Sequence, residues 1–195
     1  MERVHQPQPT PENEHGPGLR PSIYVADLAA YNAGILHGTW IRADGDLDDI
    51  TEAVAQMLRE SPEPGAEEYA IHDYDEFGCI RIGEYTDLAT VNRLAIGLAE
   101  HGCAFGHWAE LVGHDPDDLD RFEDCYRGHW DTLADYARDL LDDLGTMDEI
   151  ERAVPDWIRP YVTIQWEMLG DDLAAEMLIA EDSSRSGVSV FDPHR

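Results

Sequence analysis

The chain has 195 residues and a formal net charge of −29 at pH 7, with 42 acidic residues against 13 arginines and no lysine. Hydrophobic residues make up 43% of it, and 17 aromatic residues are spread along it, so we expect a folded protein that carries its charge on ordered elements. The charge excludes a protein that binds nucleic acid or anionic lipid. With no apolar run near about 18 residues, we expect neither a membrane span nor a signal peptide.

The N-terminal part predicts a small unit of strands and one helix. Residues 1–21 hold five of the eleven prolines and little to bury, so we expect a disordered tail. Three β-rich runs are the expected strands: residues 23–26, 36–41 and 67–74. A turn is expected at residues 32–34. Residues 46–60 place apolar side chains at helical spacing, and the Pro- and Gly-containing stretch 61–65 ends that helix.

The middle of the chain predicts a compact group of short helices. Residues 87–100 and 105–112 have helical apolar spacing. A third helix is expected to begin after Asp115, because Asp is a favoured N-cap and Pro116 suits the first helical position.

The C-terminal part mixes helices and strands again. Residues 131–144 form the clearest predicted helix, which Gly145 ends. Residues 146–154 form a shorter one, with Thr146 as the expected N-cap and Glu149 at the reciprocal position. Residues 160–164 and 187–191 are the expected strands, and residues 166–180 are helical in part despite Gly170. The elements together predict an α+β fold.

The acidic residues are concentrated in two segments. Residues 44–76 hold twelve acids and one arginine, and residues 115–151 hold fourteen acids and three arginines. In the helix over residues 131–144, Asp131, Asp135, Asp139 and Asp142 or Asp143 form one stripe opposite an apolar stripe. Its carboxylates stand about 6 Å apart along the axis, whereas one strand of B-DNA carries a phosphate every ~3.4 Å. Several stripes are therefore needed to match a duplex.

Solvation and salt adaptation are two simpler causes of such a charge, and both stay open. A charged stripe usually just faces water, although like charges four residues apart destabilise a helix. Adaptation to high salt also favours acidic, lysine-free proteins, but it would spread the acids evenly, and residues 77–114 hold only four. If the clusters bind a partner, the candidate carboxylates are Asp46, Asp49, Glu52, Asp115, Asp117, Asp118, Asp120, Glu123, Asp124, Asp131, Asp135, Asp139, Asp142 and Asp143.

The sequence contains no complete motif for metal binding or for catalysis. The EF-hand pattern breaks at Asp49 and Ala55, and His101, Cys103, His107 and His114 do not have the two close pairs of a zinc site. No nucleophile motif or phosphate-binding glycine loop is present in an ordered segment. We therefore expect no metal, no cofactor and no enzyme. Three cysteines without a C-x-x-C pair indicate a reduced, intracellular protein.

Several stretches in order resemble motifs of the ArdA antirestriction family. Residues 23–34 and 36–41 resemble its opening motif, and residues 67–74 with Phe77 resemble the next. The pattern continues with Leu88, Asn92 and Leu94. Residues 133–137 resemble the acidic antirestriction motif, and residues 160–167 and 190–191 resemble the C-terminal part. The resemblance covers roughly residues 22–191.

The resemblance implies a non-catalytic DNA mimic. Members of the family are elongated, with three small domains, and dimerise through the C-terminal region. They occupy the DNA-binding groove of type I restriction-modification enzymes, formed by the specificity and methyltransferase subunits, in the host cytoplasm, and they travel on mobile elements. We accordingly expect an N-terminal α/β domain at residues 22–82, a central helical domain at 83–124 and a C-terminal α/β domain with the dimer contact at 125–195. The apolar residues expected at that contact are Trp157, Tyr161, Ile164 and Trp166.

Two alternatives belong to other functional classes. One is an acidic, chaperone-like decoy for other basic DNA-binding proteins, which differs from the first hypothesis only in the selectivity for its target. The other is a metal-dependent enzyme that uses the carboxylate clusters, which no motif supports.

Overall fold

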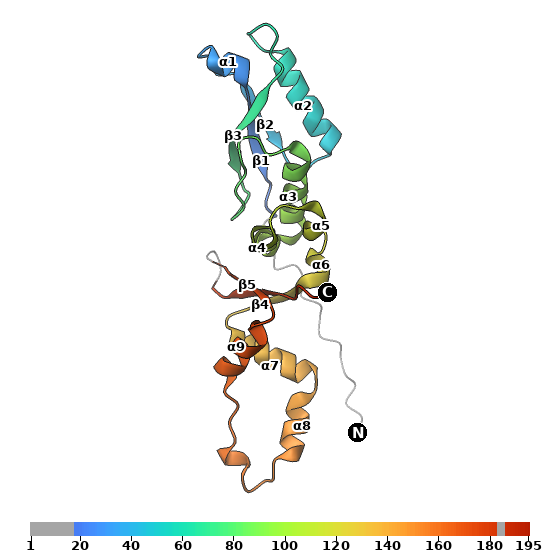
Figure 1. The fold of residues 1–195 in the computed structure, drawn as a ribbon, viewed down its shortest axis with the longest axis vertical. Helices are drawn as coiled ribbons and strands as arrows, with labels where there is room; N and C mark the ends of the chain where they lie inside the picture. The colour runs from blue at the N-terminus through green and yellow to red at the C-terminus, as the bar shows by residue number, and fades with distance from the viewer. Residues whose placement is uncertain (1–17, 183–185) are drawn as a thin grey trace. The chain divides into compact units, whose positions relative to one another are not determined.

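The computed structural model describes residues 18–182 and 186–195, so most of the tail expected at residues 1–21 lies outside the described residues. The fold is a mixture of helices and short strands, as the α+β prediction requires (Figure 1). The chain forms two compact units, which divide between Gly102 and Cys103, with residues Gly78–Arg81 belonging to the second unit. The division into three domains stays a prediction. None of the helices in the described part of the chain combines the length and apolarity of a membrane span.

The first unit is a three-stranded antiparallel sheet with helices packed against it. Its order is β2–β1–β3, with β1 (Ser22–Asp27) central between β2 (Gly38–Arg42) and β3 (Tyr69–Asp75). The short helix α1 (Leu28–Asn32) follows β1 directly and was not predicted. Alternating side chains of β1, Ile23 and Val25, face the core, where they lie opposite Ile41 and Ile71.

Two longer helices close the core of this unit. The helix α2 (Leu47–Arg59) begins after the N-cap Asp46 and buries Ile50, Val54 and Met57, at the predicted spacing. The helix α3 (Leu88–His101) packs against α2. Its buried Asn92 donates hydrogen bonds of 2.7 and 2.8 Å to the carbonyls of Ala43 and Gly45, which join the helix to the turn after β2.

The second unit contains the remaining helices and a second antiparallel sheet, ordered β4–β6–β5. Its elements in chain order are α4 (Cys103–Val112), α5 (Pro116–Leu119), α6 (Phe122–Cys125), β4 (Tyr126–Trp130), α7 (Leu133–Asp143), α8 (Thr146–Ala153), the 3-10 helix η1 (Arg159–Tyr161), α9 (Trp166–Ala174), β5 (Leu178–Glu181) and β6 (Val188–Phe191). Aromatic rings form its core. The ring centres of Trp108 and Phe122 lie 5.4 and 6.3 Å from the ring centre of Phe191.

Several local expectations are wrong. Residues 160–164 form no strand, because Pro160 lies in η1 and lacks the N–H that a strand ladder needs. Thr146 is the first residue of α8 rather than its cap; Gly145 takes the cap position in a left-handed conformation, with φ of 68°. Asp131 precedes α7, whose N-cap is Thr132. The strands β4 and β5 were not predicted.

Candidate functional site

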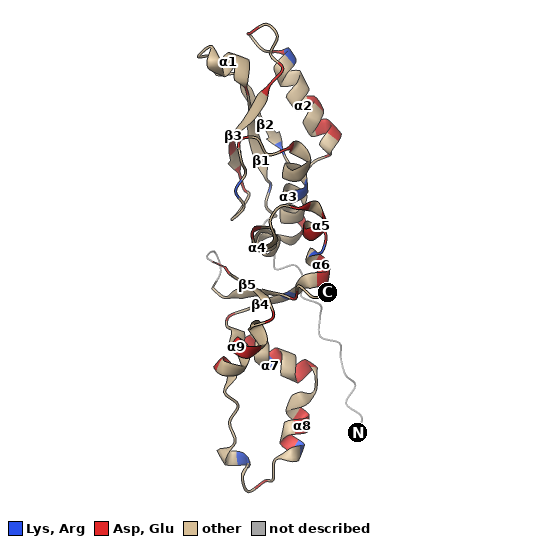
Figure 2. Ribbon diagram, viewed as in Figure 1, with Lys and Arg blue, Asp and Glu red and all other residues tan. Residues whose placement is uncertain are grey.

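The fourteen candidate carboxylates lie in three groups, on α2, on α5 and α6, and around α7 (Figure 2). Twelve of them are exposed, and Asp118 and Asp135 are half-buried. The first group belongs to one unit and the other two groups to the second. Whether the three groups form a single binding surface is therefore still a prediction.

The group on α2 consists of Asp46, Asp49 and Glu52. The Asp46 carboxylate accepts a hydrogen bond of 2.8 Å from the Asp48 amide and so caps the helix. Asp49 lies in the first turn, where a negative charge is favoured by the helix dipole. Glu52 forms an ion pair of 2.6 Å with Arg59, and both side chains are more than half exposed, so water screens this pair.

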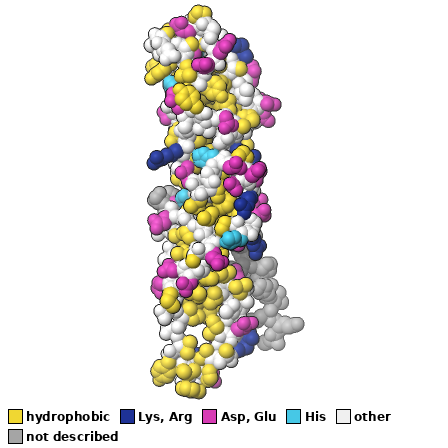
Figure 3. Space-filling view, viewed as in Figure 1, with side chains coloured by type: hydrophobic (Ala, Val, Ile, Leu, Met, Phe, Trp, Pro, Cys, Tyr) yellow, Lys and Arg dark blue, Asp and Glu magenta, His cyan; other side chains and the backbone are white. Residues whose placement is uncertain are grey.

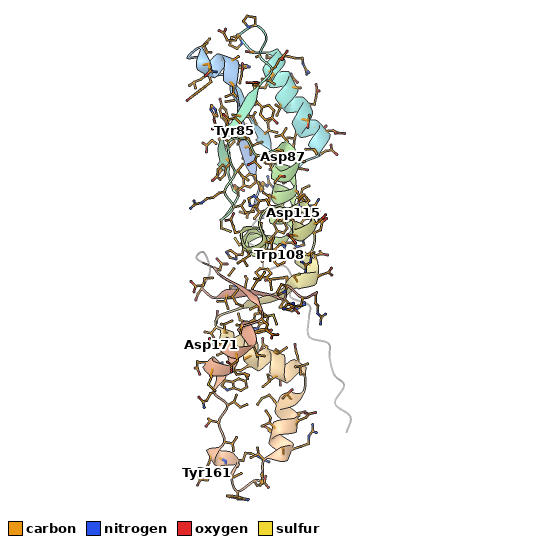
Figure 4. All side chains as sticks on the ribbon, viewed as in Figure 1. Tyr85, Asp87, Trp108, Asp115, Tyr161 and Asp171 are labelled. Carbon is orange, nitrogen blue, oxygen red and sulfur yellow. The ribbon has the colours of Figure 1, made fainter. Side chains whose placement is uncertain are left out.

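The group on α5 and α6 begins at Asp115, which is the predicted N-cap and accepts a hydrogen bond of 3.0 Å from the Asp117 amide (Figure 4). The backbone beneath it is held by Trp108, whose indole N–H donates to the Asp118 carbonyl over 3.0 Å while its ring is almost fully buried. The carboxylate of Asp118 lies 3.6 Å from Arg121. A rigid aromatic anchor thus positions a short, strongly acidic turn.

The group around α7 is partly engaged in local contacts. Thr132 caps the helix by accepting from the Asp135 amide over 3.2 Å, and its hydroxyl donates to the Asp135 carboxylate over 2.6 Å. Arg138 lies 2.6 Å from the same carboxylate. The hydroxyl of Thr132, aided by Arg138, lowers the pKa of Asp135 although partial desolvation opposes this. Asp135 is therefore a structural residue as well as a candidate contact.

Two tryptophan side chains, Trp130 and Trp166, contact charged residues of α7. The indole N–H of Trp130 donates to the Asp139 carboxylate over 2.8 Å. The guanidinium of Arg138 lies 5.2 Å from the centre of the Trp166 ring, within the range of a cation–π contact. Asp142 and Asp143 occupy the last turn of α7. The negative end of the helix dipole lies there, so these two carboxylates do not stabilise the helix.

The arrangement supports electrostatic contact with cationic groups. Among the described residues, no three His, Cys, Asp or Glu side chains come together in a way that could hold a metal ion. His107 is buried, its Nδ1 atom has no hydrogen-bond partner among the described residues, and burial lowers the pKa of its side chain, so it is a neutral core residue at pH 7. Exposed carboxylates are ionised at that pH and attract cationic side chains over a range of about 8 Å at physiological salt.

An exposed apolar segment lies in the second unit, and part of it was predicted. Trp157 and Tyr161 are 76% and 82% exposed, and α8 buries no residue at all. The expected partners Ile164 and Trp166 are only half-buried. Figure 3 shows hydrophobic side chains gathered toward one end of the second unit, and Figure 4 labels Tyr161 there. Leu144 and Met168 of the same unit are also more than half exposed and were not predicted.

One comparison with known proteins gives a match. The model of a family described as antirestriction protein (ArdA) matches residues 23–183. No curated protein matches the chain. The match covers every segment on which the candidate carboxylates lie.

Proposed function

Because the chain belongs to the ArdA antirestriction family, we propose that it inhibits type I restriction-modification enzymes by imitating B-form DNA. Family membership implies an interaction with restriction-modification enzymes in general. The finer proposal is that the carboxylates of the three groups replace duplex phosphates in the DNA-binding groove formed by the specificity and methyltransferase subunits. The inhibitor acts in the cytoplasm of a cell that has received it on a mobile element, and it makes and breaks no covalent bond.

The exposure of the candidate carboxylates supports this proposal most directly. Twelve of the fourteen are exposed, and because 42 acids share 13 arginines, most acids of the chain cannot each have an arginine of their own. A protein that tolerates so much self-repulsion gives up stability. The repulsion is relieved when a basic groove approaches, because each carboxylate then gains a cationic partner and releases its screening ions.

We also propose that the inhibitor is a homodimer. A charge of −29 matches the phosphates of only about 14 to 15 base pairs at two charges per pair, and the target of a type I enzyme extends further. The exposed surface around Trp157, Tyr161 and Met168 provides apolar area that α8 and η1 leave uncovered. A twofold contact there would bury it and would repeat each carboxylate group symmetrically.

Competition with DNA tests the proposed function. A fluorescent duplex that carries the recognition site is bound to a purified type I enzyme, and the protein is added until the signal is constant. We expect complete displacement, and a weaker apparent affinity as salt rises. A duplex that stays bound at saturating protein would show that the groove is not the target. Equal displacement of DNA from an unrelated basic DNA-binding protein would favour the decoy alternative.

A further inference from the structure

An open pocket of about 470 Å³ lies in the first unit, beside α1 and the end of β3. Its floor is apolar, because Ile71 and Ile82 line it while they are 4% and 8% exposed. None of the fourteen candidate carboxylates is among its described lining residues. The pocket is therefore a feature of the surface that the proposed imitation of phosphates does not use.

An irregularity in the sheet shapes this pocket. Asp73 lies opposite Tyr24 and Ile71 lies opposite Val25, so His72 bulges out of the ladder between them. A bulge of this kind changes the direction of neighbouring side chains and is common beside functional sites. Here Ile71 is buried at the floor of the pocket, and the three residues after it also line the pocket.

Aromatic rings form the walls, and each is held in place. Tyr31 stands edge-on to the His72 ring, with 4.7 Å between the ring centres. Tyr74 stands edge-on to Phe77 at 5.8 Å, and Phe77 is 2% exposed. Tyr31 itself is 54% exposed. The walls are thus aromatic rings that contact a neighbouring ring and are still accessible to a partner.

Two carboxylates complete the pocket, and the part of the lining that the structure describes includes no arginine. Glu84 is positioned by its own carbonyl, which accepts the Ile71 amide over 2.9 Å. The carboxylate of Glu84 lies 3.7 Å from His72, which is too long for a good hydrogen bond, so its acceptor sites stay available to a stronger donor. The Asp73 carboxylate accepts the Tyr74 amide over 2.9 Å and keeps a second oxygen.

We infer that this pocket accepts the guanidinium of an arginine side chain from the inhibited enzyme. Aromatic faces attract a cation, and carboxylates accept its N–H groups. Arginine fits better than lysine, because the planar guanidinium stacks on a ring and forks onto a carboxylate. Proteins that grip DNA display arginines toward the phosphates and the guanine edges. The inference rests on the proposed function only for the source of that arginine.

Binding of a small probe tests the pocket without the enzyme. The isotope-labelled full chain is titrated with N-acetyl-argininamide and with the citrulline analogue, which has the same shape but no charge, while NMR follows the Tyr31 and His72 signals. We expect saturable shifts with the arginine probe and none with citrulline. Tyr31→Leu should weaken the arginine probe about three- to ten-fold, and Tyr85→Leu, at an exposed tyrosine outside the lining, should not. Equal binding of both probes, or of neither, overturns the inference.

The same variants, tested on the enzyme, decide where the arginine comes from. Both keep the charge of the parent, so the dependence of inhibition on salt should stay unchanged. We expect Tyr31→Leu to require about three to ten times more protein for inhibition, with Tyr85→Leu unchanged. If the arginine probe binds but Tyr31→Leu inhibits like the parent, the enzyme does not supply the arginine. If the parent protein fails to displace DNA, the proposed function is wrong while the probe still decides the pocket.

Discussion

Asp27 is completely buried, so among the described acidic residues its role is the one most clearly structural. Its carboxylate caps α1 by accepting the Ala29 amide over 2.9 Å, and it accepts the hydroxyl of Ser61. Burial alone would raise its pKa, but the hydrogen bonds from Ser61, Ala30 and Ala29 lower the pKa on balance. Asp27 shows that some of the many acidic residues serve the folded structure and not a binding surface.

We predict that Asp27→Ala lowers the free energy of unfolding at pH 7 by about 1–3 kcal/mol, because it leaves buried donors unpaired. Since the pKa of Asp27 is lower in the folded state, its contribution is complete above the unfolded value of about 3.9 and is lost as the pH falls through the folded value. Urea unfolding at pH 7 and in acid should therefore show the difference between parent and variant shrinking below about pH 4. Glu176→Ala, an exposed control with the same charge change, should behave like the parent at both pH values.

No single exposed carboxylate should be essential for inhibition. We predict that Asp142→Asn weakens binding to the enzyme by at most about five-fold, since one exposed ion pair contributes about 0.2–1 kcal/mol. Asp142 is better suited to this test than Asp135, which also bonds to Thr132 and Arg138. The duplex-displacement assay measures the change. A hundred-fold loss from this one substitution would indicate a discrete site instead of a distributed one.

At the scale of elements, the close approach of α7 and α9 depends on one glycine. A Cβ atom at Gly170 would lie 2.6 Å from both the carbonyl carbon and the carbonyl oxygen of Leu133. The sequence showed Gly170 only as an anomaly inside a predicted helix. The structure explains it, because α9 crosses the start of α7 at this buried position.

We predict that Gly170→Ala destabilises the protein by about 1–3 kcal/mol, because backbone atoms must move to admit the methyl group. Thermal unfolding compared with Gly45→Ala provides the measurement, since Gly45 has open space around the Cβ position and an ordinary φ. A Gly170→Ala variant as stable as the parent would show that the α7–α9 contact does not depend on this glycine.

Elements governed by local signals were predictable, and elements governed by pairing were not. Asp115 caps α5 where the sequence placed it, because capping depends on residues one turn away. The short strands β4 and β5 were missed because they exist only through their pairing with β6. In the candidate site, the exposure of the carboxylates could be predicted from their charge. The hydrogen bond from Trp130 to Asp139 could not, because it depends on tertiary structure.

At the scale of the whole molecule, the exposed apolar surface of the second unit predicts association. We expect the parent to be a dimer at micromolar concentration and the double variant Trp157→Ser, Tyr161→Ser to be a folded monomer, because both side chains are more than three-quarters exposed and support no core. Sedimentation equilibrium gives the mass and circular dichroism the fold. Tyr85→Ser, which changes an exposed tyrosine in the first unit, is the matched control and should stay dimeric.

The monomeric variant also tests whether dimerisation matters for inhibition. We expect it to inhibit more weakly than the parent, because each half engages only half of an extended groove and loses the gain from linked binding. A parent that sediments as a monomer contradicts the dimer proposal. A folded monomeric variant that inhibits as tightly as the parent contradicts its functional part.

Under the proposed function, carboxylates at these particular positions stand in for phosphates. Two variants, each with five acids changed to their amides, separate position from total charge. The first changes candidate residues: Asp49, Asp124, Asp131, Asp142 and Asp143. The second changes exposed acids outside the candidate set: Glu100, Glu110, Glu167, Asp171 and Glu176.

The measurement is the dissociation constant of each variant for the enzyme across a salt series. Five lost pairs at about 0.2–1 kcal/mol each sum to about 1–5 kcal/mol, so the candidate variant should bind about five-fold to five-thousand-fold more weakly and depend less steeply on salt. The second variant should stay close to the parent in both respects. Parent-like affinity and salt dependence in the candidate variant, or equal losses in both variants, would contradict the claim that these carboxylates imitate DNA.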